Sequence, residues 1–241
     1  MLSSTLKKSL LIMLVCIPSL HASEVTESIH PVTPFTAQYS MDWNGGISLS
    51  GTTTRQLKSA ENNHWTFQSS ASAMFASIKE STVFTWQTDT LTPLHYSFKR
   101  SVLGKKRLVD VSFDWAKQQA TNDVENKPWQ MPIKSGVQDK LSYQLLLQHD
   151  VSKGKTEFDY DVADGGHIKH YAFRVDGKER IKAPIGEYDA IRVIRVREKD
   201  NPRQTYIWFA PDLNYQIIKL EQIEKKDKSY TLLLKSLKGE S

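Results

Sequence analysis

Hydrophobic and polar residues alternate with a period of two along most of the chain. Between Phe35 and Trp43, apolar side chains occupy the odd positions and polar side chains occupy the even ones. Successive side chains of a strand point to opposite faces, so this pattern gathers the aromatic residues on one face of a sheet. The same alternation recurs at residues 65–75, 82–86, 94–98, 109–115, 158–162 and 171–175.

Turn-forming residues separate these segments. Ser59–Asn63, Asp164-Gly165-Gly166 and Asp176-Gly177 are typical turn sequences, and the spacing indicates about twelve strands. An open sheet of that size tends to curl or close on itself. The sequence therefore predicts an all-β fold with one short helix, built as a large curved antiparallel sheet or a partly open β-barrel.

One segment breaks the alternation. Within residues 139–149, Leu141, Leu145 and Leu146 have helical spacing, and Asp139 suits the N-cap position of a helix. The preceding stretch 128–132, which holds two prolines, is interpreted as a loop. We expect this single helix to plug or flank the sheet.

The N-terminal residues have the pattern of a secretory signal. Lys7 and Lys8 precede an apolar run from Leu10 to Leu20, and Ala22 is a small residue suited to the cleavage site. The apolar run is too short to span a bilayer, which takes about 20 residues. We therefore expect a cleavable signal peptide at 1–22 and a single β-rich periplasmic domain at 23–241, soluble and with no membrane span after cleavage.

The composition excludes several kinds of functional site. Cys16 is the only cysteine and would leave with the signal peptide, which excludes disulfides, thiol nucleophiles and cysteine-based zinc sites. The net charge of +5 falls to +3 without Lys7 and Lys8, so no nucleic-acid partner is expected. His167 and His170 would point to opposite faces of a strand and are not expected to share a metal.

Catalytic motifs are missing from the sequence. It contains no Gly-x-Ser-x-Gly elbow, no His-Glu-x-x-His pair and no phosphate-binding glycine loop. We predict no catalytic residue, no metal ligand and no cofactor. An enzyme built from distant residues is the least favoured of three hypotheses, because triads can assemble across a fold.

Three arginines lie on one predicted strand. Arg192 falls on the opposite face from Arg195 and Arg197, so one of the two sets faces inward. An inward arginine must be ion-paired or must meet an anionic ligand. Asp139, Arg192 and Trp208 are the candidate ligand contacts, with structural roles as the alternative for each. Sequence leaves open whether the aromatic faces fill a core or line a cavity.

An ordered set of motifs resembles a known family. The segments are Pro34–Tyr39, Val111–Trp115, Asp139–Ser142, Ala183–Ala190 and Trp208–Asp212. Together they resemble the uncharacterised exported bacterial family catalogued as domain of unknown function 3108. That resemblance implies an exported β-rich protein and supplies no activity or catalytic residues.

A weaker likeness is to the half-open barrels of periplasmic lipoprotein carriers. Their late strands often carry an aromatic residue, an acidic turn and a Leu-Pro step. Here Gln216 stands where that proline is expected. The likeness is an analogy of fold.

These observations support two main functional hypotheses. The first is a non-enzymatic periplasmic binding or carrier protein for an apolar or amphipathic envelope ligand, either a lipid or a lipidated peptide. The second is an interaction module in envelope assembly, with a filled core and an envelope protein as its partner. Retention of an apolar ligand would distinguish the first from the second.

Overall fold

Strands dominate the chain. The computed structural model describes residues 33–45, 48–198, 200–225 and 228–239. The strands are β1 (Phe35–Asn44), β2 (Ser48–Ser59), β3 (His64–Ala73), β4 (Ala76–Gln87), β5 (Thr90–Val102), β6 (Lys105–Asp114), β7 (Gln119–Val124), β8 (Pro128–Pro132), β9 (Gln138–Asp139), β10 (Glu157–Asp164), β11 (His167–Ala183), β12 (Gly186–Val196), β13 (Gln204–Ala210), β14 (Gln216–Lys225) and β15 (Lys228–Gly239). The helices are α1 (Ser142–Ser152) and a short 3₁₀ turn, η1 (Pro211–Leu213).

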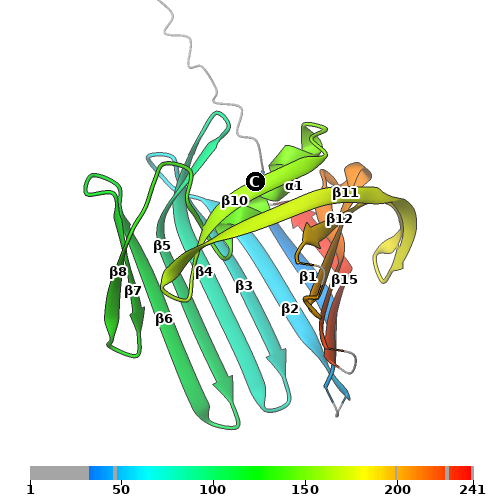
Figure 1. Ribbon diagram of the computed structural model, residues 1–241. Coiled ribbons are helices and arrows are strands. Elements are labelled where there is room, and N and C mark those ends of the chain that lie inside the picture. Colours follow the sequence, from blue (N-terminus) through cyan, green and yellow to red (C-terminus); the bar gives the residue numbers. More distant parts are fainter. Residues whose placement is uncertain (1–32, 46–47, 199, 226–227, 240–241) are drawn as a thin grey trace, which may run out of the picture.

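All fifteen strands belong to one sheet. From β1 to β8, strands that are consecutive in the chain are also neighbours in the sheet, which makes one meander. The same holds from β10 to β15, which form a second meander. The pairing of β1 with β15 joins these two meanders into one sheet, as Figure 1 shows. Every pair is antiparallel except β9 with β10. Strands β8 and β9 are the two edges, so hydrogen bonds do not close the sheet in the described part of the chain.

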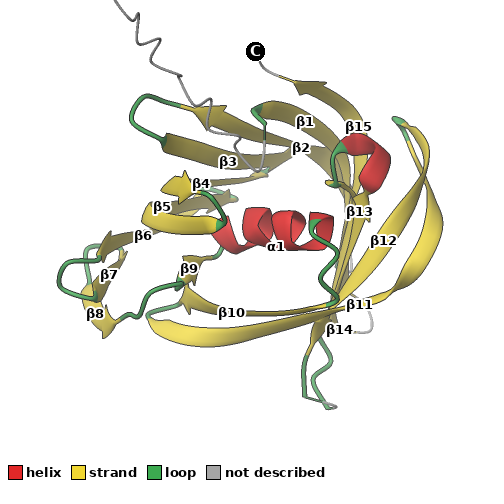
Figure 2. Ribbon diagram, turned by 90° about the horizontal axis from the view of Figure 1, so that it is seen from above, coloured by secondary structure: helices red, strands yellow, loops and turns green. Residues whose placement is uncertain are grey.

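The sheet curls around α1. Figure 2 shows the helix inside the curve, with strands on both sides of it. Along β1, Phe35, Ala37, Tyr39 and Met41 are buried while the residues between them are partly or fully exposed. The same alternation on neighbouring strands creates one apolar concave face, which forms the core. Burying each large aromatic side chain stabilises the fold by about 1.5–3 kcal/mol.

Asp139 fixes the start of α1. Its Oδ1 accepts hydrogen bonds from the backbone N–H groups of Leu141 (2.7 Å) and Ser142 (2.8 Å). The Thr82 hydroxyl on β4 donates to its Oδ2 at 2.5 Å. These bonds satisfy backbone donors that the first turn of a helix leaves unpaired. They also tie the helix to the concave face of the sheet.

Aromatic contacts hold α1 against β10 and β11. The Tyr143 ring centre lies 5.4 Å from that of Tyr171 and 5.7 Å from that of Phe173. Near the other end of the helix, Asp150 accepts a hydrogen bond from the Tyr160 hydroxyl at 2.7 Å. The helix is therefore anchored to the sheet at both ends.

The predicted fold class is confirmed: a large curved sheet, mostly antiparallel, with one α-helix. The prediction was wrong in four details. The described residues form fifteen strands rather than about twelve, and the expected loop 128–132 is the edge strand β8, where prolines cost no ladder hydrogen bond. Gly177 forms a β-bulge within β11 instead of a turn, and the helix cap is Leu141 rather than Asp139.

The predicted signal segment, residues 1–22, lies outside the described residues. Within those residues, no helix is long and apolar enough to cross a membrane.

Candidate functional site

A cavity of about 510 Å³ lies on the concave face of the sheet. Its wall comes from both meanders, β1 to β5 on one side and β14 and β15 on the other, and residues at the start of α1 contribute as well. Many of the side chains that line it are apolar: Met41, Ala71, Ala73, Ala76, Ile78, Phe98, Leu220 and Leu232.

Side-chain size explains why this region is hollow. On β3, inward positions are filled by Trp65 and Phe67 near one end of the strand, and both are buried in the core. Farther along the same face, small residues take their place: Ser69, Ala71 and Ala73. Small side chains facing one another leave open volume where large ones would pack. The sequence left open whether the interior is filled or hollow. The structure has a packed core at one end of the sheet and a cavity at the other.

Arg55 is the most buried charged residue of the cavity wall. Its side chain lies on β2 and is 5% exposed, and its Nη2 donates to Oε1 of Gln144 on α1 at 2.5 Å. The guanidinium carbon lies 4.9 Å from the centre of the Phe67 ring. Within the described residues, Arg55 makes no ion pair, and its Nε has no hydrogen-bond partner. A buried cation without a carboxylate is costly unless a ligand or water compensates it.

A carboxylate lies on the same wall as Arg55, two strands away. Glu80 on β4 accepts a hydrogen bond from the Tyr96 hydroxyl at 2.6 Å. Burial and the negative charge of Glu80 raise the pKa of Tyr96 far above its usual value. Burial also raises the pKa of Tyr230. Both phenols therefore stay protonated at neutral pH, and Tyr230 is the one that lines the cavity.

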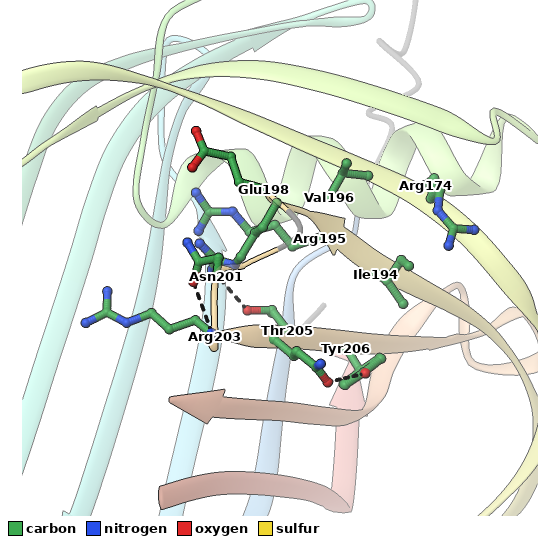
Figure 3. Close-up of a pocket in the computed structure, with 11 residues that line it drawn as sticks. Arg174, Ile194, Arg195, Val196, Glu198, Asn201, Arg203, Thr205 and Tyr206 are labelled. Atoms are coloured by element: carbon green, nitrogen blue, oxygen red, sulfur yellow. Dashed lines mark hydrogen bonds between the residues drawn. The ribbon is translucent and has the colours of Figure 1, made fainter. Parts of the chain in front are cut away.

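A second, smaller pocket of about 290 Å³ lies where β12 and β13 separate. Their paired register ends at Ile194 and Tyr206, and beyond it Glu198, Asn201 and Arg203 line the pocket. Figure 3 shows Arg195 and Arg203 among the side chains around this pocket, together with Thr205 on β13.

The inward arginines carry uncompensated charge. Arg195 and Arg197 share the inner face with buried Val193, and Arg195 lies over the Tyr171 ring at 3.3 Å. Neither makes an ion pair with a carboxylate in the described part of the chain. Burial, together with the positive charges of Arg195 and Arg203, lowers the pKa of Arg197. These side chains could hold an anionic group.

The three predicted ligand contacts lie apart from both pockets. Asp139 is fully buried at the start of α1, and burial raises its pKa to about 6 despite the donors around it. Arg192 faces away from Arg195 and forms ion pairs with Asp176 (2.6 Å) and Glu179 (3.2 Å).

Trp208 belongs to the same outer cluster as Arg192. Its indole N–H donates to Glu179 at 2.5 Å, and the Lys219 ammonium lies 4.3 Å from its ring centre. The structure thus brings Arg192 and Trp208 together and leaves Asp139 separate. Ligand contact by any of the three stays a prediction.

Sequence reasoning missed Arg55 and Gln144. A signal for Arg55 was present, because it has the same parity as Leu49 and Leu57 on its strand. Gln144 was not predictable, since its place depends on how α1 docks. As for metals, no group of three or more histidine, cysteine or acidic side chains could hold an ion among the residues that the structure describes.

Comparison with known proteins identifies the family. The model of the family described as a protein of unknown function, DUF3108, matches residues 38–235. The chain therefore belongs to that family, as its motifs predicted. Comparison with curated proteins gives no match.

The solved structures support the fold. A β-barrel-like protein of the domain of unknown function DUF1849 from Brucella abortus is 10% identical and superposes with a TM-score of 0.59, over 88% of this chain and 100% of its own. At this identity the likeness shows the fold alone.

Two further structures superpose loosely. A protein of Parabacteroides distasonis, provisionally described as a lipoprotein, is 12% identical with a TM-score of 0.30, over 87% of this chain and 97% of its own. A Vibrio parahaemolyticus domain, provisionally described as an outer membrane lipoprotein-sorting protein, is 12% identical with a TM-score of 0.25, over 87% and 86%. TM-scores this low support no conclusion about this chain.

Proposed function

We propose that this member of the DUF3108 family is a non-enzymatic binding or carrier protein for an apolar or amphipathic ligand of the cell envelope, a lipid or a lipidated peptide. The observation that carries the proposal is the cavity of about 510 Å³ with its alanine-rich wall. Its volume lies within the range of about 300–1,000 Å³ that is common for small-molecule sites.

The lining favours an acyl chain or a similar apolar group. Ala71, Ala73 and Ala76 offer a smooth apolar surface, with Phe98 and Leu232 as larger contacts. Apolar surface that leaves water on binding contributes about 25 cal/mol per Å². Flexible apolar chains need no directional partner, so the apolar part of the wall suits them, and its polar residues are left to meet a polar group of the ligand.

Arg55 favours an amphipathic ligand over a purely apolar one. It is the buried cation of the wall, and no carboxylate of the described residues pairs with it. A few convergent polar groups in an apolar pocket commonly fix the orientation of a ligand. A carboxylate or another acidic group on the ligand would compensate the Arg55 charge.

The compartment follows from the N-terminal pattern. The basic residues, the apolar run and Ala22 support export through a Sec-type signal and a periplasmic location for residues 23–241. Carriers are needed there because apolar ligands must cross an aqueous space between two membranes. The cavity and the expected compartment are therefore consistent with each other.

Filling the cavity tests the proposal. Ala71→Trp should weaken binding of N-phenyl-1-naphthylamine, an uncharged fluorophore, by about tenfold or more, because the indole would occupy ligand volume. Ser70→Trp is the matched control, since Ser70 is exposed on the opposite face of the same strand. Fluorescence titration of both variants and the wild type measures the difference.

Either of two results would contradict the carrier function. The first is a wild-type chain that takes up neither the fluorophore nor any lipid, and the second is an unchanged affinity in the Ala71→Trp variant. Those results would favour the interaction module in envelope assembly. Thermal unfolding of each variant shows whether it is folded.

A further inference from the structure

Large apolar side chains are exposed at the tips of two neighbouring hairpins. Met74 and Phe75 form the turn between β3 and β4, and they are 79% and 65% exposed. Val102 and Leu103 begin the turn between β5 and β6, and they are 37% and 76% exposed. We call these four residues the apolar tip. Contiguous exposed apolar groups on a protein surface usually mark an interaction site.

The two turns form one surface. The backbone N–H of Leu103 donates to the carbonyl of Phe75 at 3.0 Å, and Ala76 pairs with Val102 in the sheet register. The surface also adjoins the cavity, because Ala73, Ala76 and Val102 line its wall. Figure 1 shows these hairpins at the end of the sheet opposite α1.

The backbone at Leu103 disfavours a leucine. Leu103 and Gly104 have φ angles of 48° and 78°, as in the two-residue turn that prefers Asn-Gly. A side chain such as leucine in the left-handed region costs about 1–2 kcal/mol. The exposed leucine therefore gives the folded chain neither a favourable turn nor a core contact.

Six exposed cations surround the apolar tip. They are Lys79, Lys99, Arg100, Lys105, Lys106 and Arg107. None of the six makes an ion pair with any described residue, whereas Arg174, Arg180 and Arg192 on the other meander are all ion-paired. No acidic residue occurs between positions 99 and 107. Arg100 lines the cavity, and the charge on the other five is available to an external partner.

We propose that the apolar tip and the five cations that do not line the cavity dock the protein on an anionic lipid surface, with the wall of the cavity next to the bilayer. Apolar side chains beside lysine and arginine suit the interface of a membrane, where the former insert and the latter meet phosphates. Each basic residue near an anionic bilayer adds to this attraction. The docking does not depend on a ligand in the cavity, although it would bring the cavity beside the membrane.

Vesicle sedimentation tests the docking. The full chain should bind vesicles of phosphatidylethanolamine and phosphatidylglycerol, and bind pure phosphatidylcholine vesicles at least tenfold more weakly. The double variant Phe75→Ser/Leu103→Asn should bind the anionic vesicles about tenfold more weakly than the wild type. Leu103→Asn creates the preferred Asn-Gly turn, so a fall in binding cannot be attributed to a weakened hairpin.

Matched variants separate the tip from general surface effects. Trp129→Ser removes an aromatic that is 60% exposed on β8, and it should leave vesicle binding unchanged. Lys105→Gln/Lys106→Gln should weaken binding about tenfold, whereas Lys178→Gln/Lys182→Gln, at two exposed side chains of β11, should not.

The outcomes distinguish the docking from the carrier function. Wild-type protein that stays in solution with anionic vesicles, or tip variants that bind as well as the wild type, would overturn the docking. The same variants are titrated with N-phenyl-1-naphthylamine without vesicles, and they should bind it normally because Phe75 and Leu103 do not line the cavity. Vesicle binding without fluorophore uptake would leave the docking in place and contradict the carrier function.

Discussion

Buried charged side chains in this protein differ in how their charge is compensated. Asp139 receives hydrogen bonds from Thr82, Leu141 and Ser142, and its role is to hold the start of α1. Arg55 has two neutral hydrogen-bond partners, Gln144 and Tyr39, and lies over the face of Phe67. Asp139 is surrounded by hydrogen-bond donors and stabilises the fold. Arg55 lies at the cavity and pairs with no carboxylate, so its charge is available to a ligand.

Asp139 should make the stability of the protein depend on pH in an unusual direction. Burial raises its pKa from 3.8 to about 6 in the folded state, so folding favours the protonated form. Its contribution to stability is present below pH 3.8 and is lost as the pH rises through about 6. The loss is about 3 kcal/mol at most.

The substitution Asp139→Asn isolates this effect. Relative to the variant, the wild type should lose free energy of unfolding between pH 3.8 and about 6, as urea titrations at several pH values would measure. Asp161→Asn is the control, because that side chain is 56% exposed. A constant difference between wild type and the Asp139 variant across this range would contradict the account.

At the scale of elements, sequence predicted the existence of α1 better than its packing. Helical spacing of Leu141, Leu145 and Leu146 identified the helix, but burial does not follow that spacing. Leu145 and Leu147 are buried while Leu146 is partly exposed, because α1 is enclosed by the curved sheet on more than one side. A helix inside a sheet has no single apolar stripe, so its orientation could not be predicted from periodicity.

Truncating neighbouring leucines of α1 should give unequal effects. Leu145→Ala should lower the free energy of unfolding by about 3 kcal/mol, since the side chain is 1% exposed and leaves a cavity. Leu146→Ala should cost clearly less, because that residue is only partly buried. Chemical denaturation of both variants measures the difference. Equal losses would show that α1 is not oriented as described.

For the strands too, periodicity predicted the faces of single elements better than the way those elements pack together. Alternation identified which side chains of β1 and β3 share a face, and burial confirms those faces. It could not identify β1 and β15 as neighbours, because their pairing depends on how the two meanders meet. Bulges such as the one at Gly177 were also beyond prediction, since a glycine after an aspartate is equally typical of a turn.

At the scale of the whole molecule, the sheet places different chemistry at its two ends. Around α1 the interior is a packed aromatic core, with Asp139 and Tyr143 holding the helix. At the other end the interior opens into the cavity, beside exposed Phe75 and Leu103. Periodicity predicted the curved sheet but not this division, because it says nothing of the distance between opposite walls.

Native mass spectrometry of the exported chain, recovered from a bacterial periplasm and followed by lipid extraction, tests the central claim most directly. A stoichiometric lipid or lipidated peptide is expected on the wild type and on Ser70→Trp, and it should be lost in Ala71→Trp. A bare mass for the wild type, with no uptake of added lipid, would contradict a carrier function for the cavity.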